Sequence, residues 1–130
     1  AYFDQAGPKS LDRADFSTAP ARGLSPADGA ATLTAFTAET VALSLRNVPV
    51  ALNRLLVTGG GRHNPVLMRM IEQRTGVPTA PVETEGWHGD ALEAQAFAWL
   101  AVRHLRGLPF SWPETTGVPA PQTGGRLALP

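Results

Sequence analysis

The segment Asn53-Arg-Leu-Leu-Val-Thr-Gly-Gly-Gly-Arg-His-Asn-Pro65, together with residues 66–75, decides how this chain folds. It begins with an apolar run at 55–57 that stops at glycines, a pattern that predicts a short buried strand. Asn64 and Pro65 are typical of a helix cap and of the first helical position. Apolar residues then recur at helical spacing as far as residue 75. The segment therefore predicts a strand, a glycine turn and a helix.

The three glycines of this turn, Gly59, Gly60 and Gly61, form the first candidate binding site. They remove side chains where a ligand could approach the backbone, and the helix after them offers free N–H groups and a positive dipole end. The pattern is not a G-x-x-x-x-G-K-[ST] phosphate loop, and Asn64 interrupts a G-x-G-x-x-G fingerprint. The motif alone leaves a ligand site and a plain turn with positive φ equally open.

Composition excludes several classes of protein. The chain has 130 residues, 43% of them hydrophobic, and a formal net charge of +0, which indicates one globular domain without a general attraction to nucleic acid or anionic membrane. It has no cysteine, so it forms no disulfide or thiolate metal site, and we expect a cytoplasmic location. No apolar run approaches the ~20 residues of a membrane span. Because it begins Ala1-Tyr2-Phe3-Asp4, without methionine, we interpret it as a fragment.

The chain divides into three predicted parts. Residues 1–24 predict an irregular arm, with one short turn around Leu11 to Phe16. Residues 25–108 predict the folded portion, which starts with a long helix from a Ser25 cap to about Arg46. Residues 109–130 are rich in Pro and Gly and predict a tail with at most a short extended piece at 126–129.

Two further elements complete the folded portion. Residues 77–82 predict a weak edge strand because they contain two prolines, and a polar loop follows at 83–89. Residues 90–106 predict a helix that is apolar nearly all round, and therefore deeply packed, with Trp99 in the core. The order helix, strand, helix, strand, helix predicts an α/β fold with a small parallel sheet and three main helices. Ligands of such sheets bind at the carboxyl ends of the strands, where the glycines lie.

Asp90 and Glu93 have two interpretations. Asp90 as the helix cap and Glu93 three residues later would form a capping box, and this structural interpretation is favoured. Alternatively, Glu93 faces a cleft and binds a substrate. The three histidines lack the spacing of metal ligands, so we predict no metal site.

Several separated blocks, taken together, resemble one family. They occur in the family's order and are Tyr2-Phe3-Asp4 with Gly7-Pro8-Lys9-Ser10, Leu33-Thr-Ala-Phe-Thr-Ala38, Val57-Thr-Gly-Gly-Gly-Arg-His-Asn-Pro65, Gly89-Asp-Ala-Leu-Glu-Ala-Gln-Ala-Phe-Ala-Trp-Leu-Ala101 and Thr116-Gly-Val-Pro119. They resemble the C-terminal part of the anhydro-N-acetylmuramic acid kinases, within the sugar kinase, actin and heat-shock chaperone ATPase superfamily. The arm departs from the pattern, because the family commonly has Pro-Pro-Lys-Ser-Thr-Gly where this chain has Ala-Gly-Pro-Lys-Ser-Leu at 6–11.

The resemblance implies the C-terminal part of a ribonuclease-H-like lobe, one of two that enclose an ATP cleft. The family phosphorylates 1,6-anhydro-N-acetylmuramic acid with Mg-ATP while water opens the anhydro bridge, a step of peptidoglycan recycling. Carried over, Gly59, Gly60, Gly61 and Asn64 match the adenosine motif. Glu93 matches the acidic residue of a Gly-Asp-x-x-Glu-Ala segment on the sugar side.

The resemblance also implies what this chain lacks. The N-terminal lobe, with its phosphate loop and the aspartate that acts as general base, is not part of it, so no catalytic residue is assigned and we expect no turnover by these residues alone. The implied partners are ATP, Mg²⁺, the sugar and the N-terminal lobe, and a homodimer is compatible. The alternative is a non-catalytic interaction domain that keeps the lobe as a scaffold and uses the glycines as plain turns.

Overall fold

The computed structural model describes residues 2–5, 7 and 15–128. These fall into two compact units. One runs from residue 15 to 90, and the other runs from 91 to 128 and includes residues 2–5 and 7. Most of the turn predicted around Leu11 to Phe16, and the Pro-Lys-Ser block at 8–10, lie outside the described residues.

The unit of residues 15–90 contains the predicted strand–turn–helix segment. Its helices and strands are α1 (Pro26–Leu45), β1 (Leu55–Val57), α2 (Pro65–Thr75) and β2 (Thr79–Pro81), with 3₁₀ turns at Ala19–Ala21, Gly60–His63 and Val82–Glu85. The two strands are parallel, with Leu56 opposite Ala80. The predicted order of elements and the parallel pairing are therefore confirmed. Pro81 is tolerated because it ends the second strand.

Local capping explains where α1 begins and where α2 begins and ends. The Ser25 hydroxyl accepts a hydrogen bond from the Asp28 N–H (3.1 Å) and donates one to the Asp28 carboxylate (2.7 Å). Asn64 caps α2, and Gly76 closes it in the left-handed conformation with φ 68°. All three boundaries agree with the prediction.

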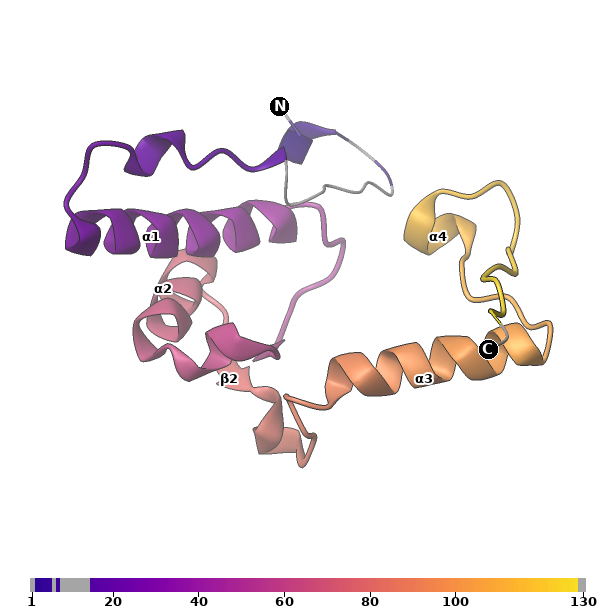
Figure 1. The fold of residues 1–130 in the computed structure, drawn as a ribbon. Helices are drawn as coiled ribbons and strands as arrows, with labels where there is room; N and C mark the ends of the chain where they lie inside the picture. The colour runs from indigo at the N-terminus through magenta and orange to yellow at the C-terminus, as the bar shows by residue number, and fades with distance from the viewer. Residues whose placement is uncertain (1, 6, 8–14, 129–130) are drawn as a thin grey trace. The chain divides into compact units, whose positions relative to one another are not determined.

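The core of this unit lies where α1 and α2 pack together (Figure 1). Ala38 of α1 is fully buried, as are nearly all of Ile71 of α2 and Val82 beyond β2. An ion pair between Arg74 and Glu39 (2.6 Å) joins the two helices at the surface.

The other unit is built around α3 (Leu92–Leu105), with a short helix α4 (Pro113–Thr116) and an isolated bridge between Ser111 and Gln122. It also contains a 3₁₀ turn at Tyr2–Asp4. The prediction of an irregular tail missed α4, which begins at a proline and ends at Gly117 with φ 73°. The extended piece predicted at 126–129 is not a strand in its described residues, 126–128.

The prediction that the helix of residues 90–106, observed as α3, is deeply packed is wrong for the described chain. No residue of α3 is buried, and Phe97 and Leu105 are 63% and 67% exposed. Trp99 is 48% exposed, and the guanidinium of Arg103 lies 4.7 Å from the centre of its ring. The physical reason is that apolar residues surround the helix, whereas Phe110 and residues 125–127 cover only part of it. Among the described residues, no helix is both long and apolar enough to cross a bilayer.

Candidate functional site

The glycine turn follows β1 directly, and all three of its glycines are exposed. Gly59 has φ 75° and ψ 178°, a conformation that is essentially restricted to glycine. The carbonyl oxygen of Gly59 accepts a hydrogen bond from the Arg62 N–H (3.3 Å), which closes the 3₁₀ turn Gly60–His63. Gly59 therefore sets the direction in which the chain leaves the strand.

Gly60 and Gly61 differ from Gly59 in what a side chain would meet. Neither has a positive φ, so neither needs to be glycine for backbone reasons. A Cβ at Gly60 would meet no atom within 4 Å, and one at Gly61 would lie 3.2 Å from a methyl carbon of Leu67. The backbone at Gly60 is therefore open to an approaching ligand, and a side chain there would stand in that space.

The start of α2 differs from the expectation of free N–H groups. The side-chain oxygen of Asn64 accepts hydrogen bonds from the N–H groups of Val66 (3.0 Å) and Leu67 (3.2 Å). The cap thus satisfies donors that a phosphate would otherwise use.

Behind the turn lies a buried arginine that the sequence analysis did not single out. The side chain of Arg62 is 2% exposed. It donates a hydrogen bond from Nε to the Glu83 carboxylate (2.8 Å), and Nη1 donates to the carbonyl oxygen of Gly59 (2.8 Å). Its Nη2 lies 2.7 Å from Oδ1 of Asp90. One guanidinium thus joins the turn to two carboxylates that follow it by more than twenty residues.

The electrostatics of this cluster favour the charged forms of all three groups. The hydrogen bond from Arg62 lowers the pKa of Asp90. The pKa of Glu83 is lowered chiefly by a hydrogen bond from its own backbone N–H, with Arg62 adding to the effect. The hydrogen bond to Asp90 raises the pKa of Arg62 further. A buried cation between two anions is the paired arrangement that burial of charge requires.

Gly89 closes the cluster from its other side. Its N–H donates to the Glu83 carboxylate (3.2 Å), and its carbonyl oxygen accepts from the Thr58 hydroxyl (3.0 Å). A Cβ at this position would lie 2.4 Å from Nε of Arg62 and 2.7 Å from the Glu83 carboxylate. A side chain at this position would therefore displace Arg62 or Glu83 from the ion pair.

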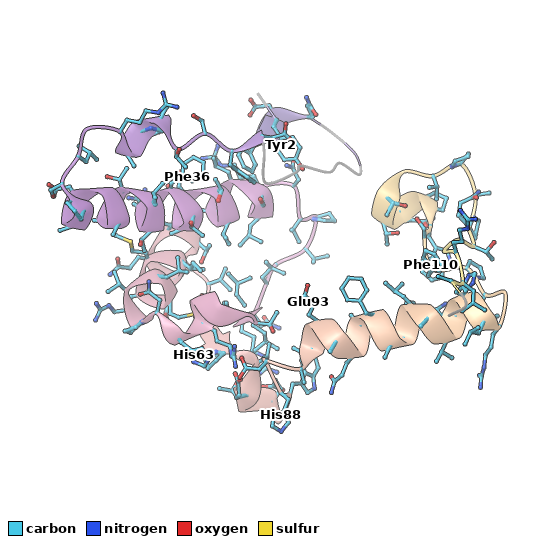
Figure 2. All side chains as sticks on the ribbon, in the orientation of Figure 1. Tyr2, Phe36, His63, His88, Glu93 and Phe110 are labelled. Atoms are coloured by element: carbon cyan, nitrogen blue, oxygen red, sulfur yellow. The ribbon has the colours of Figure 1, made fainter. Side chains whose placement is uncertain are left out.

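The favoured capping-box interpretation of Asp90 and Glu93 is wrong. Helix α3 is capped by the backbone at Ala91, without a side-chain hydrogen bond, because the Asp90 carboxylate is bound to Arg62 instead. Glu93 lies in the first turn of α3 and is exposed (Figure 2). It belongs to the unit that begins at residue 91, whereas the four other predicted site residues lie together in the 15–90 unit.

The histidines add no metal site. The ring of His63 is 66% exposed, and its Nε2 lies 3.9 Å from the Asp90 carboxylate. His104 of α3 instead places Nδ1 2.6 Å from the carbonyl oxygen of Gly124. Within the part of the chain that the structure describes, no group of three His, Cys, Asp or Glu side chains is placed to hold a metal ion.

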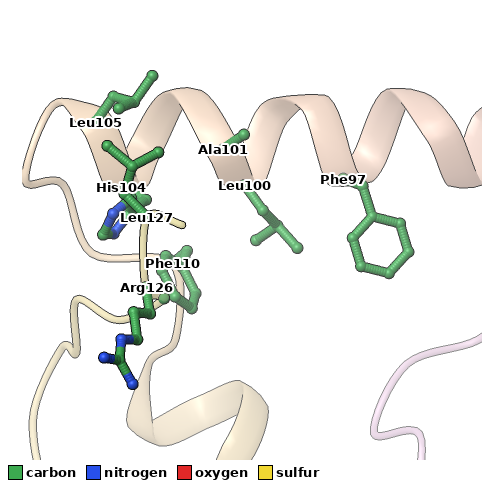
Figure 3. Close-up of a pocket in the computed structure, with 9 residues that line it drawn as sticks. Phe97, Leu100, Ala101, His104, Leu105, Phe110, Arg126 and Leu127 are labelled. Atoms are coloured by element: carbon green, nitrogen blue, oxygen red, sulfur yellow. The ribbon is translucent and has the colours of Figure 1, made fainter. Parts of the chain in front are cut away.

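The second unit contains an apolar pocket of about 380 Å³ (Figure 3). It lies between α3 and the tail and is lined by Phe97, Leu100, Ala101, His104, Leu105, Phe110, Gly125, Arg126 and Leu127. No pair of carboxylates or nucleophilic side chain lines it. The pocket therefore offers apolar surface and no evident acid–base chemistry.

Sequence reasoning missed Arg62, Glu83 and Gly89 because their partners are distant in the sequence. Two local signals were present. Arginine follows the three glycines directly, and a Gly-Asp pair precedes the apolar helix. Neither signal shows that Gly89 must be small because Arg62 lies against it.

Known proteins are similar to this chain in sequence along most of its length. The family model described as anhydro-N-acetylmuramic acid kinase matches residues 1–128. Relatives with that name are 63% identical over 124 residues in Rhizorhabdus wittichii and 58% identical over 127 residues in Rhizobium rhizogenes. The matches cover 95% and 98% of this chain, whereas the chain spans only 34% of the length of each relative. This chain belongs to the anhydro-N-acetylmuramic acid kinase family.

Proposed function

We propose that the chain is the nucleotide-binding, C-terminal portion of a cytoplasmic kinase. The whole enzyme phosphorylates 1,6-anhydro-N-acetylmuramic acid with ATP while water opens the anhydro bridge, yielding N-acetylmuramic acid 6-phosphate for peptidoglycan recycling. Residues 25–108 supply part of a ribonuclease-H-like lobe of the actin and sugar-kinase type. The family to which the chain belongs and the names of its relatives support this proposal.

The observation that carries the proposal is the exposed glycine turn at the carboxyl end of β1. In parallel α/β sheets, ligands bind at that end of the strands. Gly60 has open space where a Cβ would stand, so the flat face of a nucleoside can approach the backbone. In the proposal, Gly59, Gly60 and Gly61 hold the nucleoside end of ATP, and Asn64 adds its amide nitrogen as a donor.

The remaining parts of the reaction are assigned elsewhere. No group of three His, Cys, Asp or Glu side chains among the described residues is placed to hold Mg²⁺, and the proposal assigns the ion no ligand on this chain. Glu93 is the proposed contact on the sugar side, in keeping with its exposed carboxylate. The phosphate loop and the general base are proposed to lie in the N-terminal lobe of the full-length protein, because phosphoryl transfer depends on positioning and charge around the phosphates.

The experiment that tests this function places Gly60→Val in the full-length protein. We expect the KM for ATP to rise about tenfold, since the added side chain stands where the nucleoside must approach and displaces contacts that are worth roughly 1.4 kcal/mol. The open space around Gly60 allows the variant to fold. Kinase assays with ATP and the anhydro sugar, each at varied concentration, measure the change.

The matched control is Gly29→Ala in α1. A Cβ there would make only ordinary contacts with Ala21, at 4.0 Å, and alanine favours a helix over glycine. We expect its KM for ATP to stay at the wild-type value. If Gly60→Val also leaves it unchanged, the adenosine assignment is wrong and the scaffold alternative is favoured.

A further inference from the structure

We propose that Arg62 is a positioning residue that holds the glycine turn in the shape that receives the nucleotide. The inference rests on the proposed function of the turn and goes beyond it, because it assigns the shape of the turn to a side chain that does not touch the ligand. The candidate is distinctive because its side chain is 2% exposed and is bonded to the backbone of the turn itself.

Arg62 contacts Gly59 with both its backbone and its side chain. The left-handed φ of Gly59 turns the chain out of β1, and its carbonyl oxygen accepts two hydrogen bonds, from the N–H and from Nη1 of Arg62. The same residue thus closes the 3₁₀ turn with its backbone and fixes the turn's first peptide with its side chain. Movement of that peptide would move the N–H groups of Gly60 and Gly61 with it.

Two carboxylates hold the guanidinium of Arg62 in place. Glu83 binds its Nε and Asp90 binds its Nη2, so two carboxylates anchor the plane from which Nη1 reaches Gly59. Gly89 allows this close approach, and its N–H orients the Glu83 carboxylate. The carboxylates follow β2, and the turn follows β1, so the cluster ties the same ends of both strands together.

The three side-chain contacts of residue 62 require arginine. A guanidinium presents donors in a rigid planar fork and reaches three acceptors in different directions. A lysine ammonium is a single point on a flexible stem and cannot make the same three contacts from one position. Arg62→Lys therefore keeps the charge and the backbone hydrogen bond to the Gly59 carbonyl, and removes the hydrogen bond that Nη1 donates to it.

A nearby ion pair provides the matched control. Arg54 pairs with Glu85 in the same unit, and its side chain is 54% exposed. This pair joins one side chain to another at the surface and does not hold the glycine turn. Arg54→Lys thus makes the same chemical change in an ion pair to which the proposal assigns no role in positioning the glycine turn.

The test uses the full-length protein with Arg62→Lys, Arg54→Lys and Gly60→Val measured side by side. We expect Arg62→Lys to raise the KM for ATP about tenfold, the effect of losing a charge-assisted contact, while kcat and the KM for the sugar change less than about twofold. Arg54→Lys should leave all three values unchanged. A merely structural role would lower the active fraction, and hence kcat, without a selective effect on ATP.

The outcomes separate the two proposals. If Gly60→Val raises the KM for ATP and folded Arg62→Lys does not, the positioning role is wrong and the nucleotide site stands. If neither variant changes it, the proposed function itself fails. Should Arg62→Lys not fold, Glu83→Gln decides: it keeps an acceptor for the arginine but removes one anchoring charge. A selective rise in the KM for ATP then supports the role, and an unchanged value overturns it.

Discussion

Gly59, Gly60 and Gly89 show three different reasons for glycine at the scale of single residues. Gly59 has a backbone conformation that favours glycine, Gly60 leaves open space on the surface, and Gly89 leaves room for the ion pair between the buried Arg62 and the partly exposed Glu83. The sequence predicted the first two as members of one turn. The third could not be predicted, because its reason is Arg62, whose side chain reaches Gly89 only through the pairing of β1 with β2.

Gly89→Ala tests this steric reason. The new Cβ would lie 2.4 Å from Nε of Arg62, so the guanidinium must move and lose partners. We expect the full-length protein to lose about 1–3 kcal/mol of stability, as overpacked sites do, seen as a lower midpoint of thermal unfolding. Gly60→Ala makes the same change in open space and should leave the midpoint within a degree or so. Equal midpoints for the two variants would contradict the assignment.

The charges of the same cluster predict a dependence on pH. Arg62 lowers the pKa of Asp90, and hydrogen bonds lower that of Glu83, so the folded state holds these protons less tightly than the unfolded chain. The stability they contribute is therefore complete at neutral pH and is lost as the pH falls below about 4. We expect the difference in thermal midpoint between the wild type and Asp90→Asn to shrink from pH 7 to pH 3. A constant difference would contradict this.

At the scale of elements, local signals predicted α2 and missed the start of α3. Asn64, Pro65 and Gly76 lie at the two ends of α2, so both ends of this helix could be predicted from the sequence alone. The local sequence predicted Asp90 as a helix cap in the same way. Its carboxylate is bound by Arg62, 28 positions earlier, and such a tertiary partner overrides a cap because an ion pair with a buried cation is the stronger contact. The first turn of α3 is consequently formed without a side-chain cap.

At the scale of the whole chain, the predicted burial of α3 failed for a reason that is itself informative. A helix that is apolar all round is ordinarily buried. In the described residues Phe110 and residues 125–127 form one side of an apolar pocket against α3, and large side chains such as Phe97 and Leu105 stay exposed. The pattern of residues was interpreted correctly as apolar, but the amount of chain available to cover it cannot be read from the helix alone.

This exposed helix gives the last prediction, which concerns the 130-residue chain on its own. Apolar surface of this extent binds hydrophobic dyes and promotes association. We expect the isolated chain to enhance the fluorescence of such a dye, and Phe97→Gln with Leu105→Gln to reduce that enhancement by about half or more, because these two side chains are among the most exposed of the large apolar ones.

The same sample tests catalysis. With the phosphate loop and general base assigned to the rest of the full-length protein, the isolated chain should transfer no phosphate from ATP to the anhydro sugar, as measured with labelled γ-phosphate. The full-length protein assayed in parallel is the positive control. Transfer by the isolated chain would show that these residues hold more of the catalytic machinery than the glycine turn and Glu93. The proposed assignment of the phosphate loop and the general base to the N-terminal lobe would then be wrong.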